Sequence, residues 1–259
     1  MTNSFLMSTD DRGVATVTLN RPDKHNAFDD QLIQELTHQL KLIDEDSSIR
    51  LMVLTGSGES FSSGADLAWM QSMVNYDVTT NHQDAMQLAL LMQTLHQLSQ
   101  PTIARVNGSA FGGAIGLIAC CDMAIASEQA MFAFSEIKLG IAPAVISPYV
   151  IAAIGVHQAK RLFLTGEFFS ATEAHRIGLI SHCVSPNELD IQVENYLKLL
   201  LKGGQQAQRS IKELLHALYP IDEDVTQASA ALIAKLRTSE EGQEGLTAFL
   251  EKRPPVWKK

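Results

Sequence analysis

Short apolar runs alternate with helical segments along most of this chain, and this order limits the folds that it can adopt. The strand-like runs lie at residues 14–20, 50–56, 102–106 and 122–126. After Asp29, apolar residues recur every three or four positions, which predicts a helix capped by that aspartate or by Asp30. A second helix is expected to end near Ser99, after a mixed polar stretch at 70–82 that we interpret as a mobile loop. Strands that alternate with helices indicate an α/β core.

From about Asn187 the pattern becomes wholly helical. Helices are predicted at 187–202, 205–218, 223–237 and 239–252. Before them lie "GLISHCV", which is typical of a short strand, and a short helical piece for which Ser170 is the candidate cap. A run of helices after the alternating elements indicates an α-helical C-terminal appendage on the α/β core.

The composition is that of an ordinary globular protein, and it excludes several classes of function. The 259 residues are 46% hydrophobic and 19% charged, and the net charge of −9 argues against nucleic acid as a partner. No uninterrupted apolar run reaches about 18 residues, so no membrane span is expected. The first residues, "MTNSFLMSTDDRG", lack the basic and apolar regions of a secretory signal. We therefore expect a cytoplasmic protein with no membrane partner.

The cysteines and histidines show no pattern of disulfides or metal ligands. Cys120 and Cys121 are adjacent, and adjacent cysteines rarely pair. With Cys183 as the third cysteine, buried free thiols in a reducing compartment are expected. The eight histidines show no metal-ligand spacing, so no metal site is expected.

Two glycine turns lie where a strand is expected to end and a helix to begin. They are "SSGAD" (62–66) and "FGGAIG" (111–116). The first N–H groups of a helix have no internal partner, and two of them aimed at one point would form an oxyanion hole for a carbonyl oxygen. The alternative interpretation is that these glycines only permit tight turns between a strand and a helix. The phosphate-loop, dinucleotide and nucleophile-elbow motifs are absent from the sequence.

Glu136 is the candidate acid or base. It lies between Phe134 and Ile137 in the otherwise apolar stretch "FAFSEIKLGIAPAVISPYV". A carboxylate in apolar surroundings has a raised pKa, which suits proton transfer near neutral pH. A solvated glutamate at the end of an element is the alternative.

Together these segments resemble the crotonase (enoyl-CoA hydratase/isomerase) superfamily. The similarity covers nearly the whole chain and includes, in order, "LNRPDKHNAF", "FSSGADLAWM", "PTIARVNGSAFGGAIGLIACCDMAIASEQAMFAFSEIKLGI", "LTGEFFSATEAHRIGLI" and "GLTAFLEKRPPVW". The resemblance implies a crotonase-type spiral of ββα units over 1–200. It also implies a C-terminal α-helical oligomerisation region over 201–259, which packs homotrimers that often pair as hexamers.

The resemblance further implies an acyl-CoA thioester substrate, with no cofactor besides the coenzyme A that the substrate carries. It places the backbone N–H groups of Ala65 and Gly113 in the oxyanion hole, and it makes Glu136 the catalytic acid/base. The residues that it implies for binding of substrate or CoA are Ala27, Ala65, Asp66, Leu67, Ala68, Gly113, Gly116, Phe249 and Lys252. In many relatives the residues that match Phe249 and Lys252 come from a neighbouring subunit.

The sequence departs from the two-glutamate hydratases at Gly116, the position of their first catalytic glutamate. Only the second, Glu136, is kept, as in enoyl-CoA isomerases and some hydratases. A glycine at 116 leaves space for a larger or branched acyl group, and an ordered water or a carboxylate of the substrate would then replace the missing acid. The segment "GGAIGLIACCDMAI" followed by "SEIKLGIAPAVISPYV" is most similar to a bacterial subgroup that hydrates methylglutaconyl-CoA in leucine degradation.

We therefore expect hydration of a branched, carboxylated enoyl-CoA, with 3-methylglutaconyl-CoA as the first candidate. The alternatives are hydration of isohexenylglutaconyl-CoA in terpene degradation, and Δ3,Δ2-enoyl-CoA isomerisation, which needs only one carboxylate. A non-catalytic protein that binds acyl-CoA or RNA is disfavoured by the retained Glu136 and the negative net charge. Arg105 and Lys138 are the cations considered for the second carboxylate, and both are expected to be solvated instead.

Overall fold

A six-stranded sheet forms the centre of the fold in the computed structural model, which describes residues 4–258. Its strands are, in sheet order, β1 (Phe5–Thr9), β2 (Val14–Leu19), β3 (Leu51–Gly56), β4 (Thr102–Val106), β6 (Met123–Ser127) and β9 (His182–Val184). β1 pairs with β2 in antiparallel fashion, and all the other neighbours are parallel. A smaller sheet contains β5 (Ala110–Phe111), β7 (Met131–Ala133) and β8 (Phe169–Ser170).

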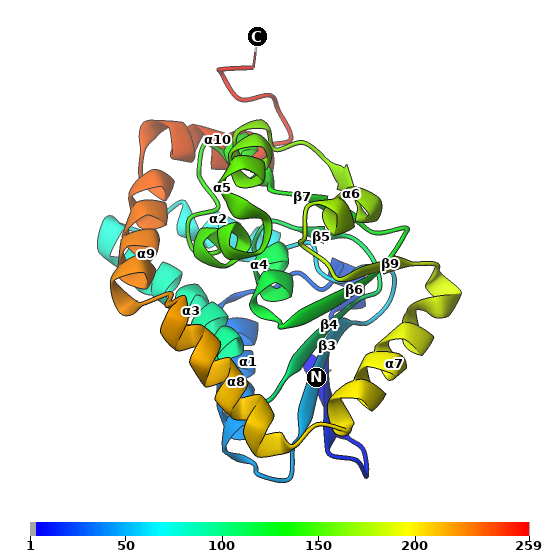
Figure 1. The fold of residues 1–259 in the computed structure, drawn as a ribbon. Helices are drawn as coiled ribbons and strands as arrows, with labels where there is room; N and C mark the ends of the chain where they lie inside the picture. The colour runs from blue at the N-terminus through cyan, green and yellow to red at the C-terminus, as the bar shows by residue number, and fades with distance from the viewer. Residues whose placement is uncertain (1–3, 259) are drawn as a thin grey trace.

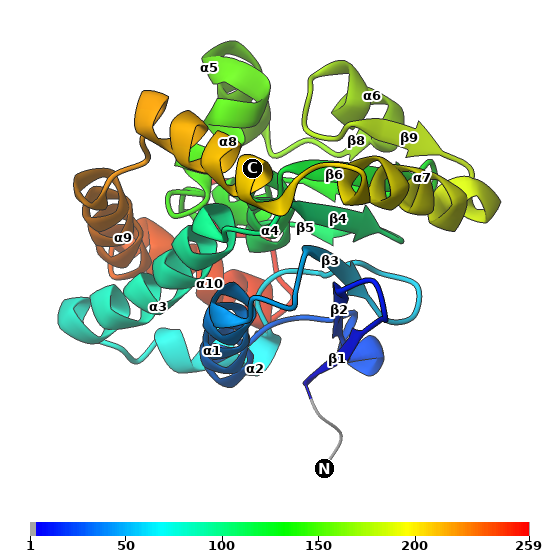
Figure 2. The same cartoon turned by 60° about the horizontal axis from the view of Figure 1, so that its bottom comes forward.

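Helices cover both faces of the main sheet, as Figure 2 shows for α1 and α3 on one side and α7 on the other. The helices of the larger apolar cluster include α1 (Asp30–Glu45), α3 (Val78–Gln97), α4 (Gly113–Cys120) and α5 (Ser147–Thr165), and α7 (Leu189–Leu201) covers the opposite face. In β3, Met52 belongs to the larger cluster and Val53 to the smaller one, because successive side chains of a strand point to opposite faces. Burial on both faces explains why the parallel strands are nearly continuous apolar runs.

The side-chain caps expected from the sequence are present where helices begin. The Asp29 carboxylate accepts a hydrogen bond from the Leu32 N–H at 3.0 Å and caps α1, whereas Asp30 is the first helical residue. The Ser170 hydroxyl accepts from the Glu173 N–H at 3.2 Å and caps α6 (Ala171–Arg176). Both caps provide an acceptor for N–H groups that have no partner within the helix.

The prediction of a mobile loop at 70–82 is wrong. This stretch contains the end of α2 (Leu67–Met73) and the start of α3, joined by a short turn. Asp66 caps α2, and Asp77 caps α3 by accepting from the Thr80 N–H at 2.7 Å. The polar composition concealed two helix ends, because cap residues are themselves polar.

Helices follow one another in the C-terminal region. They are α8 (Gln205–Leu218), α9 (Glu223–Arg237) and α10 (Glu240–Leu250), in agreement with the predicted helices. α9 packs along α3, as Figure 1 shows, and α10 contacts α2 and the short 3₁₀ helix η2 (Ser135–Leu139) that holds Glu136. The C-terminal region therefore forms part of the wall around the candidate acid.

The cysteines are free thiols, as predicted, with Cys120 and Cys121 buried. Within residues 4–258, no helix is both long enough and apolar enough to cross a bilayer. The same residues contain no group of three or more His, Cys, Asp and Glu side chains arranged to hold a metal ion.

Candidate active site

Two loops that follow neighbouring parallel strands lie side by side. Ser62, in the loop after β3, forms a parallel bridge with Ala110, after β4, and its carbonyl accepts from the Phe111 N–H at 3.1 Å. On its other side, the first loop is bonded to Phe28. The Phe28 N–H donates to the Gly64 carbonyl at 2.8 Å, and the Asp66 N–H donates to the Phe28 carbonyl at 2.9 Å. These bonds fix the backbone on both sides of Ala65.

The two glycine turns present unpartnered N–H groups beside each other. Within residues 4–258, neither the Ala65 N–H nor the Gly113 N–H donates a hydrogen bond. Gly64 has a φ of +86°, and a Cβ there would lie 2.7 Å from the Phe111 carbonyl oxygen and 4.0 Å from the Gly113 nitrogen. Glycine is therefore needed at 64 for both its conformation and the close approach of the loops. Two such donors can bind one carbonyl oxygen and stabilise negative charge on it.

The Glu136 carboxylate lies against the backbone that precedes Gly113. Gly112 has a φ of +53°, and a Cβ there would lie 3.0 Å from Glu136 Oε1. Glu136 Oε2 is buried, and no residue of the described chain hydrogen-bonds to it. Burial raises the pKa of Glu136 to about 7. A carboxyl group that titrates near neutral pH can both accept and return a proton during one reaction.

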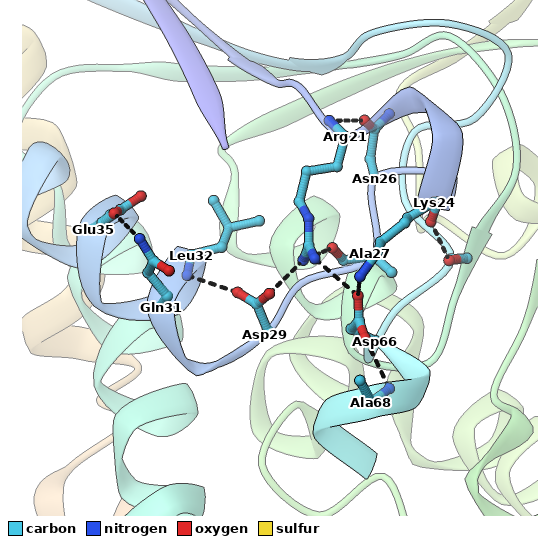
Figure 3. A network of polar contacts seen from close by, with 11 residues as sticks. Arg21, Lys24, Asn26, Ala27, Asp29, Gln31, Leu32, Glu35, Asp66 and Ala68 are labelled. Carbon is cyan, nitrogen blue, oxygen red and sulfur yellow. Dashed lines mark hydrogen bonds and ion pairs between the residues drawn. The ribbon is translucent and has the colours of Figure 1, made fainter. Parts of the chain in front are cut away.

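A network of ion pairs holds the first loop in place (Figure 3). Asp66 Oδ2 accepts from Arg21 Nη2 at 2.9 Å and from Lys24 Nζ at 2.7 Å, and Oδ1 accepts from the Ala68 N–H at 2.8 Å. Burial raises the pKa of Asp66, but these hydrogen bonds outweigh that effect and hold it below its usual value. Arg21 also donates to the Ala27 carbonyl at 2.7 Å. The resemblance implied that Asp66 binds CoA, but its carboxylate is already engaged within the chain.

A cavity of about 710 Å³ borders both the candidate donors and the candidate acid. The predicted site residues that line it are Ala27, Ala65, Asp66, Leu67, Gly113, Glu136 and Phe249. Phe249 belongs to α10 of the same chain and borders the cavity. Ala68 and Lys252, both exposed, lie outside the lining.

Gly116 does not line the cavity either, which corrects the expectation that it opens space for an acyl group or a water. A Cβ at Gly116 would lie 2.2 Å from Ile146 Cγ2 and 3.1 Å from Met92 Sδ. Ile146 itself lines the cavity. The side chain of Ile146 therefore fills the place of the missing acid with hydrocarbon, and the cavity wall is apolar at this point.

Of the two cations considered from the sequence, only Lys138 borders the cavity. Its Nζ lies 4.6 Å from the centroid of the Phe168 ring, whereas Arg105 pairs with Asp190 at 2.6 Å. Arg237, which was not predicted from the sequence, lines the cavity from the end of α9. No local signal marks this arginine, because only the packing of α9 brings it to the site.

The parallel strands are followed by N–H groups that can hold a carbonyl oxygen, and a buried carboxylate lies beside them, so the site can stabilise negative charge on a carbonyl oxygen and transfer a proton. Residues 9–259 match the family model described as enoyl-CoA hydratase/isomerase. The chain belongs to this family, so the expected membership of the crotonase superfamily, with its α/β fold, is confirmed.

Several relatives agree with this assignment. The chain is 34% identical to the 2,3-dehydroadipyl-CoA hydratase of Escherichia coli, over 98% of this chain and 99% of that protein. It is 33% identical to the crotonyl-CoA hydratase of Syntrophomonas wolfei, over 93% and 92%. The crystal structure of an enoyl-CoA hydratase from Shewanella pealeana is similar with a TM-score of 0.81 and 42% identity, covering 98% of this chain and 96% of that one.

Proposed function

We propose that this protein is an enoyl-CoA hydratase that acts on a branched enoyl-CoA. The acyl group carries a free carboxylate in addition to the thioester, and 3-methylglutaconyl-CoA is the leading candidate. The observation that carries the proposal is the position of Glu136 against Gly112, directly before the N–H of Gly113. This arrangement places one proton-transfer group beside the donors that would hold the thioester oxygen.

In the proposed reaction, water adds across the conjugated double bond. The ionised Glu136 takes a proton from water, and the water oxygen bonds to the β-carbon. The electron pair of the double bond moves toward the thioester carbonyl, giving an enolate whose oxygen accepts from the N–H groups of Ala65 and Gly113. Protonated Glu136 then returns its proton at the α-carbon, which regenerates the carboxylate. Coenzyme A enters as part of the substrate, and no further cofactor takes part.

The N–H donors and the carboxylate are each expected to increase the reaction rate by an amount typical of that type of catalytic group. One oxyanion donor typically contributes about 100- to 1,000-fold in rate, and one general acid/base about 100- to 10,000-fold. The two N–H groups depend on loop geometry, which the Asp66 network holds in place. Pre-set donors need no rearrangement when the enolate forms, so their stabilisation is fully available in the transition state.

Two observations support a carboxylated substrate. The relative from Escherichia coli is named for 2,3-dehydroadipyl-CoA, an enoyl thioester that carries a distal carboxylate. In this chain, a guanidinium group, that of Arg237, borders the same cavity as Glu136. The stretch at 141–150 is similar to that of the methylglutaconyl-CoA subgroup, and this similarity is the reason to favour a diacid with a five-carbon main chain and a methyl branch.

Δ3,Δ2-enoyl-CoA isomerisation is the second candidate, and a specific observation favours it. Ile146 makes the place of the first glutamate apolar, and a single carboxylate suffices to move a proton between two carbons. Isohexenylglutaconyl-CoA, which shares the glutaconyl carboxylate, is the alternative substrate for hydration.

An assay of the purified protein against a panel of thioesters tests these functions. The panel contains 3-methylglutaconyl-CoA, isohexenylglutaconyl-CoA, crotonyl-CoA and a 3-enoyl-CoA. Hydration removes the absorbance of the conjugated thioester, whereas isomerisation of the 3-enoyl-CoA creates it. We expect the highest kcat/KM for hydration of 3-methylglutaconyl-CoA. If the protein isomerises the 3-enoyl-CoA but hydrates no thioester of the panel, the proposed hydratase activity is wrong.

A further inference from the structure

We propose that Arg237 binds the second carboxylate of the substrate and thereby sets the preference of the enzyme among enoyl-CoA thioesters. The inference rests on the proposed hydratase function, and it identifies the residue that recognises the substrate class.

Arg237 is the most buried of the lysines and arginines that border the cavity. Its side chain is 8% exposed, whereas those of Lys24 and Arg253 are 53% and 38% exposed, and Lys138 is exposed as well. A buried cation binds an anion more strongly than an exposed one, because less water competes and the surroundings screen the charge less. Among these cations, Arg237 is the best placed to distinguish a carboxylate from a methyl group.

Asp84 and Trp69 hold the guanidinium group in one orientation. Arg237 Nη1 donates to Asp84 Oδ2 at 2.7 Å, and the other oxygen, Oδ1, accepts from Trp69 Nε1 at 3.0 Å. The guanidinium carbon lies 6.0 Å from the centroid of the Trp69 ring. An arginine has five N–H donors, and within residues 4–258 this guanidinium forms only the bond to Asp84. Its other nitrogens keep some accessible surface, and Arg237 is one of the residues that line the cavity.

A continuous row of contacts connects Arg237 to the candidate oxyanion hole. The ring of Phe28 packs against Gly113, where a Cβ would lie 2.8 Å from Phe28 Cζ. The Phe28 and Trp69 ring centroids are 6.3 Å apart, and Trp69 contacts Arg237. Several of the other side chains that line the cavity are apolar and include Met73, Leu88, Ile233 and Leu246. An unpaired carboxylate is costly to bury on such a wall, so an acyl group that ends in a carboxylate requires a partner there.

Binding of saturated analogues tests the inference without turnover. Glutaryl-CoA ends in a carboxylate and butyryl-CoA does not, and neither has a double bond to hydrate. In the double variant Arg237→Met/Asp84→Asn, both charges are removed together, so no unpaired buried charge remains. By calorimetry, we expect this variant to lose about 10- to 100-fold in affinity for glutaryl-CoA, the range of a charge-assisted hydrogen bond. Its affinity for butyryl-CoA should stay within about twofold.

Two further variants complete the experiment. Arg237→Lys keeps the charge but loses the fork of donors, so its affinity for glutaryl-CoA should lie between those of the wild type and the double variant. Arg161→Met removes a surface arginine that pairs with Glu167 and Glu173 away from the cavity. This control should leave the binding of both analogues unchanged.

The failure of this inference can be distinguished from failure of the proposed function. If the double variant keeps its preference for glutaryl-CoA, or loses affinity for both analogues equally, the Arg237–Asp84 pair only connects α9 to α3 and the inference is wrong. A wild-type protein that hydrates crotonyl-CoA but shows no preference for glutaryl-CoA would reject the carboxylated substrate class, and with it the inference. A wild-type protein that binds glutaryl-CoA through Arg237 but hydrates no thioester would reject the hydratase alone.

Discussion

The side chain of Ile146 occupies the position that a side chain at residue 116 would need. In relatives with two catalytic glutamates, the resemblance places an acid at this position, whereas here Cγ2 of an isoleucine fills it. The cavity wall is therefore apolar at this position. Glu136 is the carboxylate that lies against the candidate oxyanion turn at Gly112.

We expect Gly116→Ala to destabilise the protein by about 1–3 kcal/mol, because the added methyl group overpacks a filled core position. Ile146→Ala should also destabilise it, by leaving a cavity. In the double variant the new methyl group enters the space that Ile146 vacates, so the double variant should cost less than the sum of the two single changes. Denaturant unfolding of all four proteins gives this coupling energy. Additive costs would show that the two positions do not compete for space.

Replacing Glu136 by Gln should lower kcat by about 100- to 10,000-fold, because the amide cannot take up or return the proton. Binding of a saturated acyl-CoA should change little, since the backbone donors remain. Steady-state kinetics and calorimetry measure the two effects separately. Glu167→Gln, which alters an exposed carboxylate paired with Arg161, provides the control and should keep full activity. A similar loss of rate in both variants would remove Glu136 from the mechanism.

The raised pKa of Glu136 predicts how activity and stability depend on pH. Because the ionised form starts the reaction, kcat/KM should rise with pH and level off above about 7, the pKa of the buried carboxyl group. This acidic limb should be absent from the residual activity of Glu136→Gln.

The effect on stability has the opposite direction. Between the unfolded pKa of about 4.3 and the folded pKa of about 7, the folded state binds more protons than the unfolded state, so stability falls as pH rises. Glu136→Gln removes this cost, so the variant should gain stability over the wild type at pH 8 but not at pH 4. Denaturant unfolding at the two pH values measures the difference. An equal difference at both would contradict the assigned burial of the carboxylate.

Asp66→Asn tests the network that positions Ala65. The amide oxygen can still cap α2, but it loses the charge that pairs with Arg21 and Lys24. We expect kcat to fall by about 10- to 100-fold, part of the contribution of one oxyanion donor, while the Kd of a saturated acyl-CoA changes less. Lys24→Met, which removes the more exposed of the two cations, should have a smaller effect. If Kd rises as much as kcat falls, Asp66 binds CoA directly, as the resemblance implied.

The homotrimer or hexamer implied by the resemblance stays a prediction, and α8 offers a test. Its exposed apolar residues are Ile211, Leu214, Leu215 and Leu218. An exposed apolar row on one helix is typical of an interface. Light scattering should show a trimer or a larger assembly for the wild type, and a smaller species for the double variant Leu214→Glu/Leu218→Glu. A monomeric wild-type protein would contradict the expectation.

The sequence predicted elements whose signal is local. The bounds of α8 and α9 and the strand β4 agree with the periodicity, and the Asp29 and Ser170 caps were identified from residue type and position. Each of these features depends on residues within one or two helical turns, so the pattern of apolar residues and caps suffices. The prediction of a loop at 70–82 was wrong because the polar residues that cap α3 and fill its first turn are of the same types that form loops.

Within the candidate site, the sequence and the resemblance that it carries predicted the two glycine turns, Ala65 and Gly113 as candidate oxyanion donors, and Glu136 as the candidate acid. Only the tertiary structure decided that Ile146 fills the place where the two-glutamate relatives have their first glutamate, that Asp66 is held by Arg21 and Lys24, and that α9 brings Arg237 to the cavity. Each of these pairings joins residues far apart in the chain. The physical reason is that local periodicity specifies which face of an element is buried, whereas the packing of the elements against one another specifies which side chains meet.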